Sequence, residues 1–426
     1  MYKIIKSYTG IFLLLMLLLC FSKTWAISAT PYNASVKPIS TIDTLKPDYV
    51  VAKDGSGNFK TIAEALSFIT NASTHRIIIY IKNGVYNEKL TINRPNITLI
   101  GESRKQTRIE FSIPAGVEQP SRGVLNIFGD GVILENLTIA NTYPQRRHTF
   151  ALYGRGSFVL TKGCDFIANG NDTVALWAVG GGYYYHADCH FEGNVDYLCP
   201  RGWCYVTNST FYEVDTRAAL WHDGDLDPSK KLVVKNSSFK GAHQYSLGRY
   251  PRDAQFYLIG CRFSDSTTNI RDDDAPAKLT EEFRYGRRAY FYNSHKDGGD
   301  EPWHANNLSQ APGAPKPADI TAEWTFNGVW NPETTAQPKI VAVKFGSPYR
   351  TVQVMFSEPV TVRGKPVLKT VKGKSLKWTS INGTNVITFS PIDKGDAPVG
   401  IEVQGGSIFG SKPSTTIRYA NLRLKD

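Results

Sequence analysis

The chain of 426 residues contains few residues of several types, and each shortage excludes some classes of protein. Only 6 cysteines and 3 methionines occur, and no Cys-x-x-Cys pair is present, so a zinc site is not expected. Charged residues make up 20% and apolar residues 41%, which excludes general disorder. The abundant residues are 36 Gly, 23 Pro and 12% aromatics, which favour strands and turns.

Long apolar runs are also scarce, and the longest lies at the N-terminus. Two lysines precede an apolar run over residues 11–21, which is shorter than the roughly 20 residues of a membrane-spanning helix. Because a small residue, Ala26, follows, residues 1–26 are predicted to be a signal peptide. Lipid attachment at Cys20 is the alternative, but the bulky Leu19 precedes it. We therefore expect a secreted, periplasmic or cell-surface protein with no integral membrane segment in the mature chain.

The formal charge of +11 is unevenly distributed. Residues 335–426 hold 14 Lys and Arg against 5 Asp and Glu, whereas residues 27–334 hold 32 against 33. A basic excess favours contact with an acidic polymer or surface, so the C-terminal segment is the candidate for such contact. We expect no nucleic-acid partner.

A short pattern recurs through the middle of the chain. A β run is followed most often by Asn or Gly and then by a closing apolar residue, at Ile139, Phe166, Phe191, Phe211, Phe239 and Phe263. This loose period, without a 3.6-residue repeat, predicts a parallel β-solenoid. The residues two positions before the last five closing residues are small, and we interpret them as core: Cys164, Cys189, Ser209, Ser237 and Cys261.

The regions around these repeats complete the predicted domain plan. Thr61 should open a short helix that closes the N-terminal end of the solenoid. After residue 334, short alternating strands between Gly and Pro turns predict a small immunoglobulin-like β-sandwich. The predicted chain is therefore all-β, with a linker over residues 27–46, a parallel β-helix over residues 47–334 and the β-sandwich over residues 335–426.

Several segments, in a common order and spacing, carry a specific resemblance. They are residues 51–65 (VAKDGSGNFKTIAEA), 81–88 (IKNGVYNE), 137–142 (LTIANT), 193–197 (GNVDY) and 247–249 (LGR). Over roughly residues 47–334 the chain resembles the pectin methylesterase (pectinesterase) family. The resemblance implies a right-handed parallel β-helix that acts on pectin, that is, homogalacturonan polysaccharide. We expect a monomer with no cofactor and no metal ion.

The resemblance also implies a catalytic set of Asp172, Asp196 and Arg249. Asp172 and Asp196 are 24 residues apart, about one coil, so both carboxylates can lie on one face. In the family's mechanism Asp196 is the nucleophile and Arg249 orients it and favours its ionised form. Asp172 donates a proton to the leaving methoxide and later accepts one from water.

The chain departs from the family at the positions that support the oxyanion. Two glutamines are usual there, whereas this chain has His148 and Asn171. Both residues keep a hydrogen-bond donor, but the loss of one such donor can cost about 100- to 1000-fold in rate. We therefore expect these two replacements to lower the catalytic efficiency relative to the family.

Further candidates are aromatic and basic residues in or near turns. Aromatic faces bind sugar rings, and arginine pairs with uronate carboxylates. The proposed substrate-binding residues are Tyr250, Trp177, Trp203, Trp221, Arg201 and Arg252. Cys199 and Cys204 are close enough in sequence for a disulfide.

Three functions remain open from the sequence. The first is an exported hydrolase that removes methyl esters from the galacturonic acid units of pectin and releases methanol. The second is a catalytically weak or inactive β-helix that binds galacturonan, because both family glutamines are replaced. The third is a pectate lyase, which usually needs a calcium site and a basic residue; the Asp172, Asp196 and Arg249 set fits the esterase better.

Overall fold

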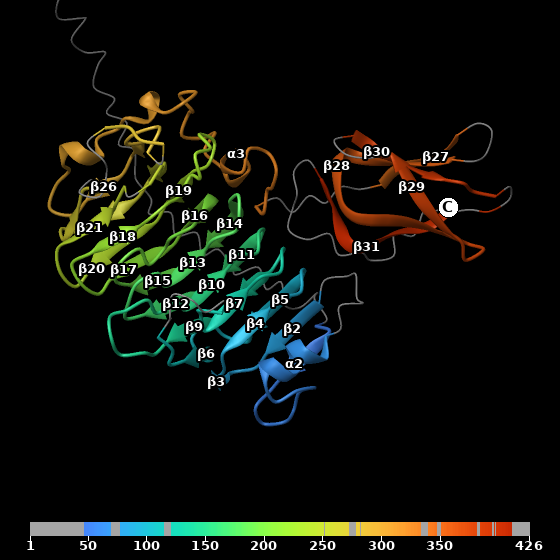
Figure 1. The fold of residues 1–426 in the computed structure, drawn as a ribbon, viewed down its shortest axis with the longest axis horizontal. Helices are drawn as coiled ribbons and strands as arrows, with labels where there is room; N and C mark the ends of the chain where they lie inside the picture. Colours follow the sequence, from blue (N-terminus) through green and yellow to red (C-terminus); the bar gives the residue numbers. More distant parts are fainter. Residues whose placement is uncertain are drawn as a thin grey trace, which may run out of the picture. The chain divides into compact units, whose positions relative to one another are not determined.

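The computed structural model describes residues 47–69, 77–114, 121–250, 252–271, 278–281, 283–333, 340–346, 351–380, 384–393, 396 and 398–410. The predicted signal peptide with Cys20 and the predicted linker lie outside the described residues. Within the described β-helix, three parallel sheets run along the coils, which Figure 1 shows stacked from the blue N-terminal end to the yellow end.

Sheet I has ten strands, and all of its pairings are parallel. In spatial order they are β1 (Tyr49–Val51), β2 (Ile77–Ile81), β5 (Ile97–Gly101), β8 (Ile133–Glu135), β11 (Val159–Lys162), β14 (Gly182–Ala187), β16 (Gly202–Thr207), β19 (Leu232–Lys235), β22 (Phe256–Ile259) and β25 (Ala289–Tyr292).

Sheet II has nine parallel strands. They are β3 (Gly84–Asn87), β6 (Thr107–Phe111), β9 (Thr138–Asn141), β12 (Asp165–Ala168), β15 (His190–Gly193), β17 (Thr210–Glu213), β20 (Ser238–Gly241), β23 (Arg262–Phe263) and β26 (His295–Lys296).

Sheet III is the most interrupted of the three. It comprises β4 (Leu90–Ile92), β7 (Leu125–Ile127), β10 (Leu152–Gly154) and β13 (Val174–Leu176), then β18 (Ala218–Leu220), β21 (Tyr245–Gly248) and β24 (Thr267–Thr268). Single bridges from Leu198 to Val174 and to Leu220 join the two parts. Successive coils that pair in parallel confirm the predicted right-handed parallel β-helix.

The recurring Asn or Gly of the sequence pattern forms the turn between sheets I and II. These residues adopt left-handed φ angles between 46° and 64°, a region that Asn, Asp and Gly tolerate best. They are Asn136, Gly163, Asp188, Asn208, Asn236, Gly260 and Asn293.

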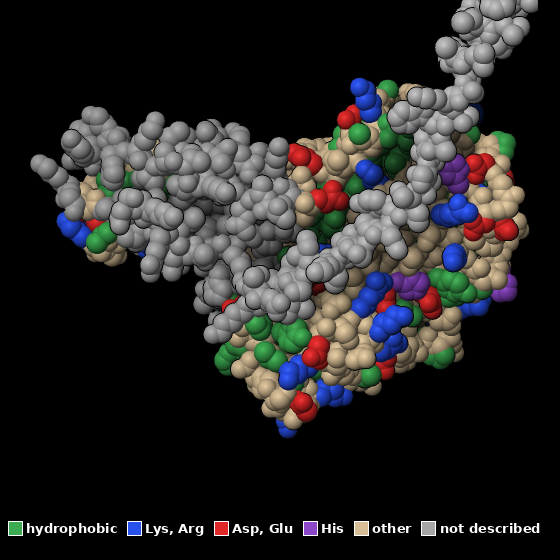
Figure 2. Space-filling model, turned by 180° about the vertical axis from the view of Figure 1, so that it is seen from behind, with side chains coloured by type: hydrophobic (Ala, Val, Ile, Leu, Met, Phe, Trp, Pro, Cys, Tyr) green, Lys and Arg blue, Asp and Glu red, His purple; other side chains and the backbone are tan. Residues whose placement is uncertain are grey.

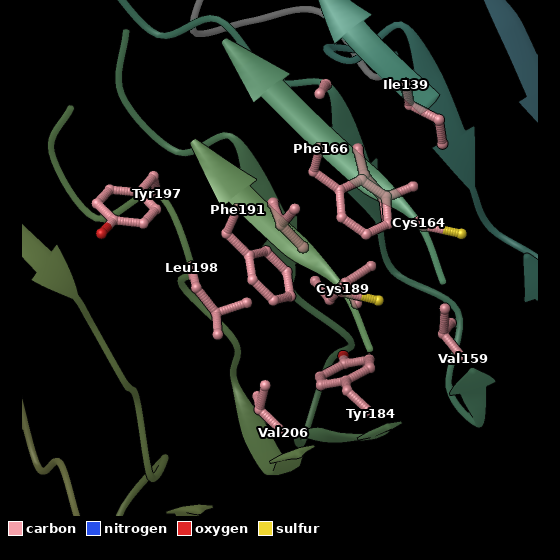
Figure 3. Close-up of a cluster of buried hydrophobic side chains, with 14 of the residues drawn as sticks. Ile139, Val159, Cys164, Phe166, Tyr184, Cys189, Phe191, Tyr197, Leu198 and Val206 are labelled. Atoms are coloured by element: carbon pink, nitrogen blue, oxygen red, sulfur yellow. The ribbon is translucent and has the colours of Figure 1, made fainter. Parts of the chain in front are cut away.

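The predicted closing residues stack in the interior of the coils. Ile139, Phe166, Phe191, Phe211, Phe239 and Phe263 pair in exact sequence along sheet II. Figure 3 shows the Phe166 and Phe191 rings beside one another, with Cys164 and Cys189 next to them. The Phe211 and Phe239 ring centroids are 4.3 Å apart. The predicted small residues are also core, since Cys164, Cys189, Ser209, Ser237 and Cys261 are all buried.

The N-terminal end is covered by helix α2 (Ile62–Phe68), as predicted. Thr61 is its N-cap, and Thr61 and Glu64 form a capping box that satisfies two backbone donors of the first turn. Glu88 accepts from the Ile62 and Ala63 amides as well. The helix buries Ile62 and Ala65 against the core of the β-helix.

Residues 297–333 follow the last coil and return over sheet I. They contain the short helices η2 (Pro302–His304), η3 (Leu308–Gln310) and α3 (Ala322–Thr325). Phe326 and Trp330 are buried in a cluster with side chains of β11, β14, β16, β19 and β22. This segment therefore covers the outer face of sheet I.

The C-terminal segment forms an antiparallel sheet. Strand β28 (Thr351–Thr370) pairs with β27 (Ile340–Gly346), β29 (Ser375–Ser380), β30 (Thr384–Ser390) and β31 (Pro398–Gly410). These five strands make up the sheet among the described residues, and residues 411–426 lie outside them. The all-β, antiparallel character is confirmed; the immunoglobulin-like sandwich and the boundary near residue 334 stay predictions.

Candidate active site

The two predicted aspartates lie at equivalent positions on neighbouring coils, where the chain passes from sheet II to sheet III. Val174 bridges to Leu198, so Asp172 and Asp196, each two residues earlier, are in register. Both adopt left-handed backbone angles, with φ of 59° and 54°. Such a conformation is uncommon for a residue with a side chain and occurs often at functional sites.

Asp196 is held by the third predicted residue, Arg249, which immediately follows β21. The Arg249 Nε donates to both Asp196 oxygens, at 2.8 and 3.1 Å, and Arg249 Nη2 donates to Oδ2. This fork fixes the carboxylate orientation and supplies a positive charge beside it. The Asp196 side chain is only 6% exposed, whereas that of Arg249 is 26% exposed.

Asp172 lies in a different environment. Its residue is 7% exposed, and its Oδ1 accepts from the buried Cys199 thiol at 3.5 Å. Burial, and then the Asp196 charge, raise the pKa of Asp172 to about 7. One aspartate is thus ion-paired with an arginine, while its neighbour is able to carry a proton near neutral pH.

His148 and Asn171 lie beside this pair. Their backbones form a parallel bridge, and His148 Nε2 is 3.3 Å from Asp172 Oδ2. The His148 side chain is 52% exposed and stacks on Phe150. Burial, and then the charge of Arg122, lower the pKa of His148, so the neutral ring with one N–H donor is favoured.

Four of the six predicted substrate-binding residues form one strip beside Asp172. Trp177 follows β13 and donates its indole N–H to the Cys199 carbonyl at 2.8 Å. The Arg201 guanidinium carbon lies 4.8 Å from the Trp177 ring centroid and 5.7 Å from that of Trp221. Arg252 Nε is 3.9 Å from Asp223 Oδ2, to which Arg201 Nε also points at 3.7 Å.

The structure does not support the other two residues as sugar platforms. Trp203 lies on β16 in sheet I, where its ring stacks on Tyr183 at 4.7 Å, so it packs on another face than the one that carries the aspartate pair. Tyr250 is only 4% exposed and contacts Phe256 in the core. Both residues are near turns in sequence, but their side chains point into packing clusters rather than to the site.

The positions of the cysteines decide whether the predicted disulfide can form. All five described cysteines are buried free thiols. Cys199 belongs to the aromatic cluster outside sheet III, whereas Cys204 lies in the interior core. A Cys199–Cys204 disulfide is therefore not formed.

Two residues of the site were missed from the sequence. Cys199 contacts Asp172, and Arg122 lies over the Tyr153 and Trp177 rings, 5.5 and 5.9 Å from their centroids. The register could have identified Cys199, because Cys199 and Trp221 each come one residue after a paired position, Leu198 and Leu220. No sequence signal marks Arg122, which precedes β7 without a motif.

The described part of the chain is thus a parallel β-helix with an in-register aspartate pair and one arginine that is paired with Asp196. Residues 48–219 match the family model described as Pectinesterase. This stretch of the β-helix is therefore similar to that family.

Curated relatives match the same part of the chain. The chain is 30% identical over 247 residues to a probable pectinesterase/pectinesterase inhibitor of Arabidopsis thaliana, covering 53% of this chain and 47% of the relative. It is 30% identical over 237 residues to pectinesterase 2 of Citrus sinensis, covering 50% and 45%. This chain thus spans about half the length of these relatives.

Among solved structures, the fold is similar to two pectin methylesterases. The protein of Erwinia chrysanthemi has a TM-score of 0.56 at 21% identity, with 66% of this chain and 97% of that chain covered. The carrot protein has a TM-score of 0.54 at 19% identity, with 63% and 92% covered. These structures share the β-helix fold.

Proposed function

We propose that the protein is a pectin methylesterase that hydrolyses the methyl esters of galacturonic acid units and releases methanol. The observation that carries the proposal is the contrast within the aspartate pair. Asp196 is ion-paired with Arg249, as a carboxylate nucleophile requires, whereas burial and the Asp196 charge raise the pKa of Asp172 to about 7. Two carboxyl groups with separate environments can take separate acid and nucleophile roles.

In the first half of the reaction, an Asp196 oxygen attacks the ester carbonyl carbon. The carbon–methoxide bond breaks, Asp172 gives its proton to the departing oxygen, and methanol leaves. An acyl anhydride on Asp196 remains, and Asp172 is now a carboxylate. Arg249 keeps Asp196 aligned through its two N–H donors.

In the second half, Asp172 takes a proton from water as the water oxygen attacks the acyl carbon. The bond to Asp196 breaks, and a free galacturonic acid unit is released with both aspartates restored; the acid then loses its proton to the solvent. In both halves the carbonyl oxygen becomes negative, and we assign its hydrogen bonds to His148 and the Asn171 amide. The half-exposed ring of His148 beside Asp172 supports this role.

The site of action is part of the proposal. We propose secretion or export to the cell surface, because residues 1–26 show a signal-peptide pattern. Among the described residues, no helix is both long and apolar enough to cross a membrane.

A second candidate function is a galacturonan-binding β-helix of weak or no activity. The specific observation is that His148 Nε2 lies 3.3 Å from Asp172 Oδ2. The ring can therefore donate its hydrogen bond to the proposed acid, and the oxyanion would then lack this donor. The strip of Trp177, Trp221 and Arg201 would remain available for binding in either case.

Methanol release from highly methylated pectin separates the two functions. We expect release by the wild type and a loss of at least ~10³-fold in Asp196→Ala, because the nucleophile is removed. Asp297→Asn is the matched control, since Asp297 is an aspartate in a surface pair with Arg262. Pectin binding without methanol release by the wild type would reject the esterase, and an unsaturated, ultraviolet-absorbing product would indicate a lyase.

A further inference from the structure

A buried glutamate, Glu213, ends strand β17 and has no part in the proposed reaction. Side chains alternate along a strand, so Glu213 faces the interior with Phe211, whereas Tyr212 between them is 36% exposed. Glu213 itself is 0% exposed. Burial disfavours the charged form of a carboxyl group unless hydrogen-bond donors or a cation compensate the charge. The surroundings of Glu213 therefore decide whether it is ionised.

The neighbouring coils give this side chain its place. Glu213 pairs in register with Gly193 on one side and with Gly241 on the other. On each of those coils a tyrosine four residues later packs against the glycine. A Cβ on Gly193 would lie 2.4 Å from the Cβ of Tyr197, and a Cβ on Gly241 would lie 2.5 Å from Cδ1 of Tyr245. Burial, and to a lesser extent the Glu213 charge, raises the pKa of both buried phenols. Glu213 therefore lies on the coil between those of two buried tyrosines, within range of both.

The described residues compensate a charge on Glu213 only in part. The Asp215 amide donates to Glu213 Oε1 at 3.0 Å. The other oxygen, Oε2, is buried without a hydrogen-bond partner among the described residues, as is the Tyr197 hydroxyl. The Arg146 charge favours the ionised form, but Arg146 is itself ion-paired with Asp215. Burial, with smaller contributions from the Asp215 and Asp196 charges, raises the pKa of Glu213 to about 8. At neutral pH Glu213 is therefore mostly the neutral acid.

The turn that carries Asp196 is supported by the Glu213 strand. At the start of this turn, the Val214 amide donates to the Gly193 carbonyl at 2.9 Å. At its end, Tyr197 follows Asp196 directly, and Figure 3 shows its ring among the buried side chains of the interior. The Asp196 charge disfavours ionisation of Glu213, and such a coupling between two groups is reciprocal. A negative charge on Glu213 would therefore act on Asp196 as well.

We propose that Glu213 is a positioning residue for Asp196: as the neutral acid it supports the Asp196 turn from the interior, and when it loses its proton to the solvent at alkaline pH it places a second negative charge behind the nucleophile. Attack by Asp196 makes the carbonyl oxygen of the ester negative. A charge on Glu213 opposes that change, whereas the neutral acid does not. The inference rests on the proposed esterase function and adds a group that lowers its rate at alkaline pH, apart from the loss of the Asp172 proton.

Titration of the Glu213 carboxyl group tests the inference without any turnover. In carbon-13 NMR of the full chain, the carboxyl signal that is absent in Glu213→Gln should report a pKa of about 8. Asp196→Asn should move this midpoint to lower pH, because a negative neighbour is removed. Asp297→Asn, which changes an aspartate in a surface pair with Arg262, should leave it in place. A Glu213 pKa near the ordinary value of 4.5, or a midpoint unchanged in Asp196→Asn, would overturn the inference.

The pH dependence of methanol release adds a second, independent measurement. The kcat/KM of Glu213→Gln should lie within about twofold of the wild-type value near about pH 6 and exceed it about fivefold near about pH 9. The reason is that glutamine has the size of the neutral acid and cannot ionise. A ratio that is equal at both pH values would overturn the inference, because a residue with only a structural role changes the rate to the same extent at each pH.

Glu192→Gln is the matched control for this profile. Glu192 precedes Gly193 on β15, but its side chain is 33% exposed beside His190 on the outer face of sheet II. The ratio of its kcat/KM to the wild-type value should therefore not rise with pH. If Glu213 titrates near pH 8 and responds to Asp196, but the wild type releases no methanol at any pH, the esterase function fails and the coupling of the two carboxyl groups stands.

Discussion

At the scale of single residues, Asp172 is the group whose proton decides the direction of the proposed reaction. Burial and the Asp196 charge raise the pKa of Asp172 to about 7. Acylation needs the protonated form, which is present below this pKa and is lost as the pH rises through it. We therefore expect kcat/KM for methanol release to fall tenfold per pH unit well above about pH 7. A kcat/KM that stays level to pH 9 would contradict Asp172 as the acid.

The Cys199 thiol tunes the same group. Its hydrogen bond lowers the pKa of Asp172 and partly offsets burial. A serine hydroxyl is a stronger donor, so Cys199→Ser should move the falling limb of the pH profile to lower pH. Cys199→Ala removes the donor and should move it to higher pH.

The buried Cys204 provides a control for this effect. Cys204→Ser also replaces a buried thiol, but Cys204 lies in the interior core, whereas Cys199 belongs to the outer aromatic cluster next to Asp172. Cys204→Ser should change the stability of the protein and leave the falling limb of the pH profile unchanged. A shift of the same sign in Cys199→Ser and Cys199→Ala would reject a positioning role for Cys199.

At the scale of structural elements, the repeat could be predicted from the sequence because equivalent positions in each coil meet the same physical requirement. The closing residue of each coil is buried between its neighbours above and below, and the turn before it needs a left-handed residue. The buried position therefore selects Phe and the left-handed position selects Asn or Gly, and both recur once per coil. The location of the Trp203 and Tyr250 side chains could not be predicted from the sequence, because a position near a turn does not show on which face a side chain lies.

The interior stack gives a stability prediction. Phe211 lies between Phe191 and Phe239, with ring centroids 5.0 and 4.3 Å away. Phe211→Ala should lower the free energy of unfolding by about 3–5 kcal/mol, because a buried aromatic leaves a cavity. Its neighbour Tyr212 is 36% exposed, so Tyr212→Ala should cost less than about 1 kcal/mol. Denaturant midpoints measure both, and similar losses would contradict a continuous stack.

At the scale of the whole molecule, the charge is divided between two segments of different character. Over the described part of the face drawn in Figure 2, basic and acidic side chains alternate without a large patch of one sign. This agrees with 32 basic and 33 acidic residues over residues 27–334, against 14 and 5 over residues 335–426. We therefore expect long-range attraction of an acidic polymer to come from the C-terminal segment.

The hairpin formed by the end of β28, the following turn and β29 is where this attraction can be tested. Lys372 and Lys377 are exposed, while Lys374 between them pairs with Asp393. Replacing Lys372 and Lys377 by Gln should weaken retention on low-ester pectin roughly threefold at low salt. The difference should vanish near 1 M salt, where the screening length is about 3 Å.

The matched control replaces two exposed lysines of the β-helix, Lys162 and Lys240, by Gln. It removes the same charge from a nearly neutral segment, so a general loss of charge would weaken retention equally in both variants. Retention that falls only when the C-terminal lysines are replaced assigns the polymer contact to that segment. If methanol release from a short, soluble methylated oligomer is unchanged in both variants, the contact acts on polymer capture and leaves the catalytic residues unaffected.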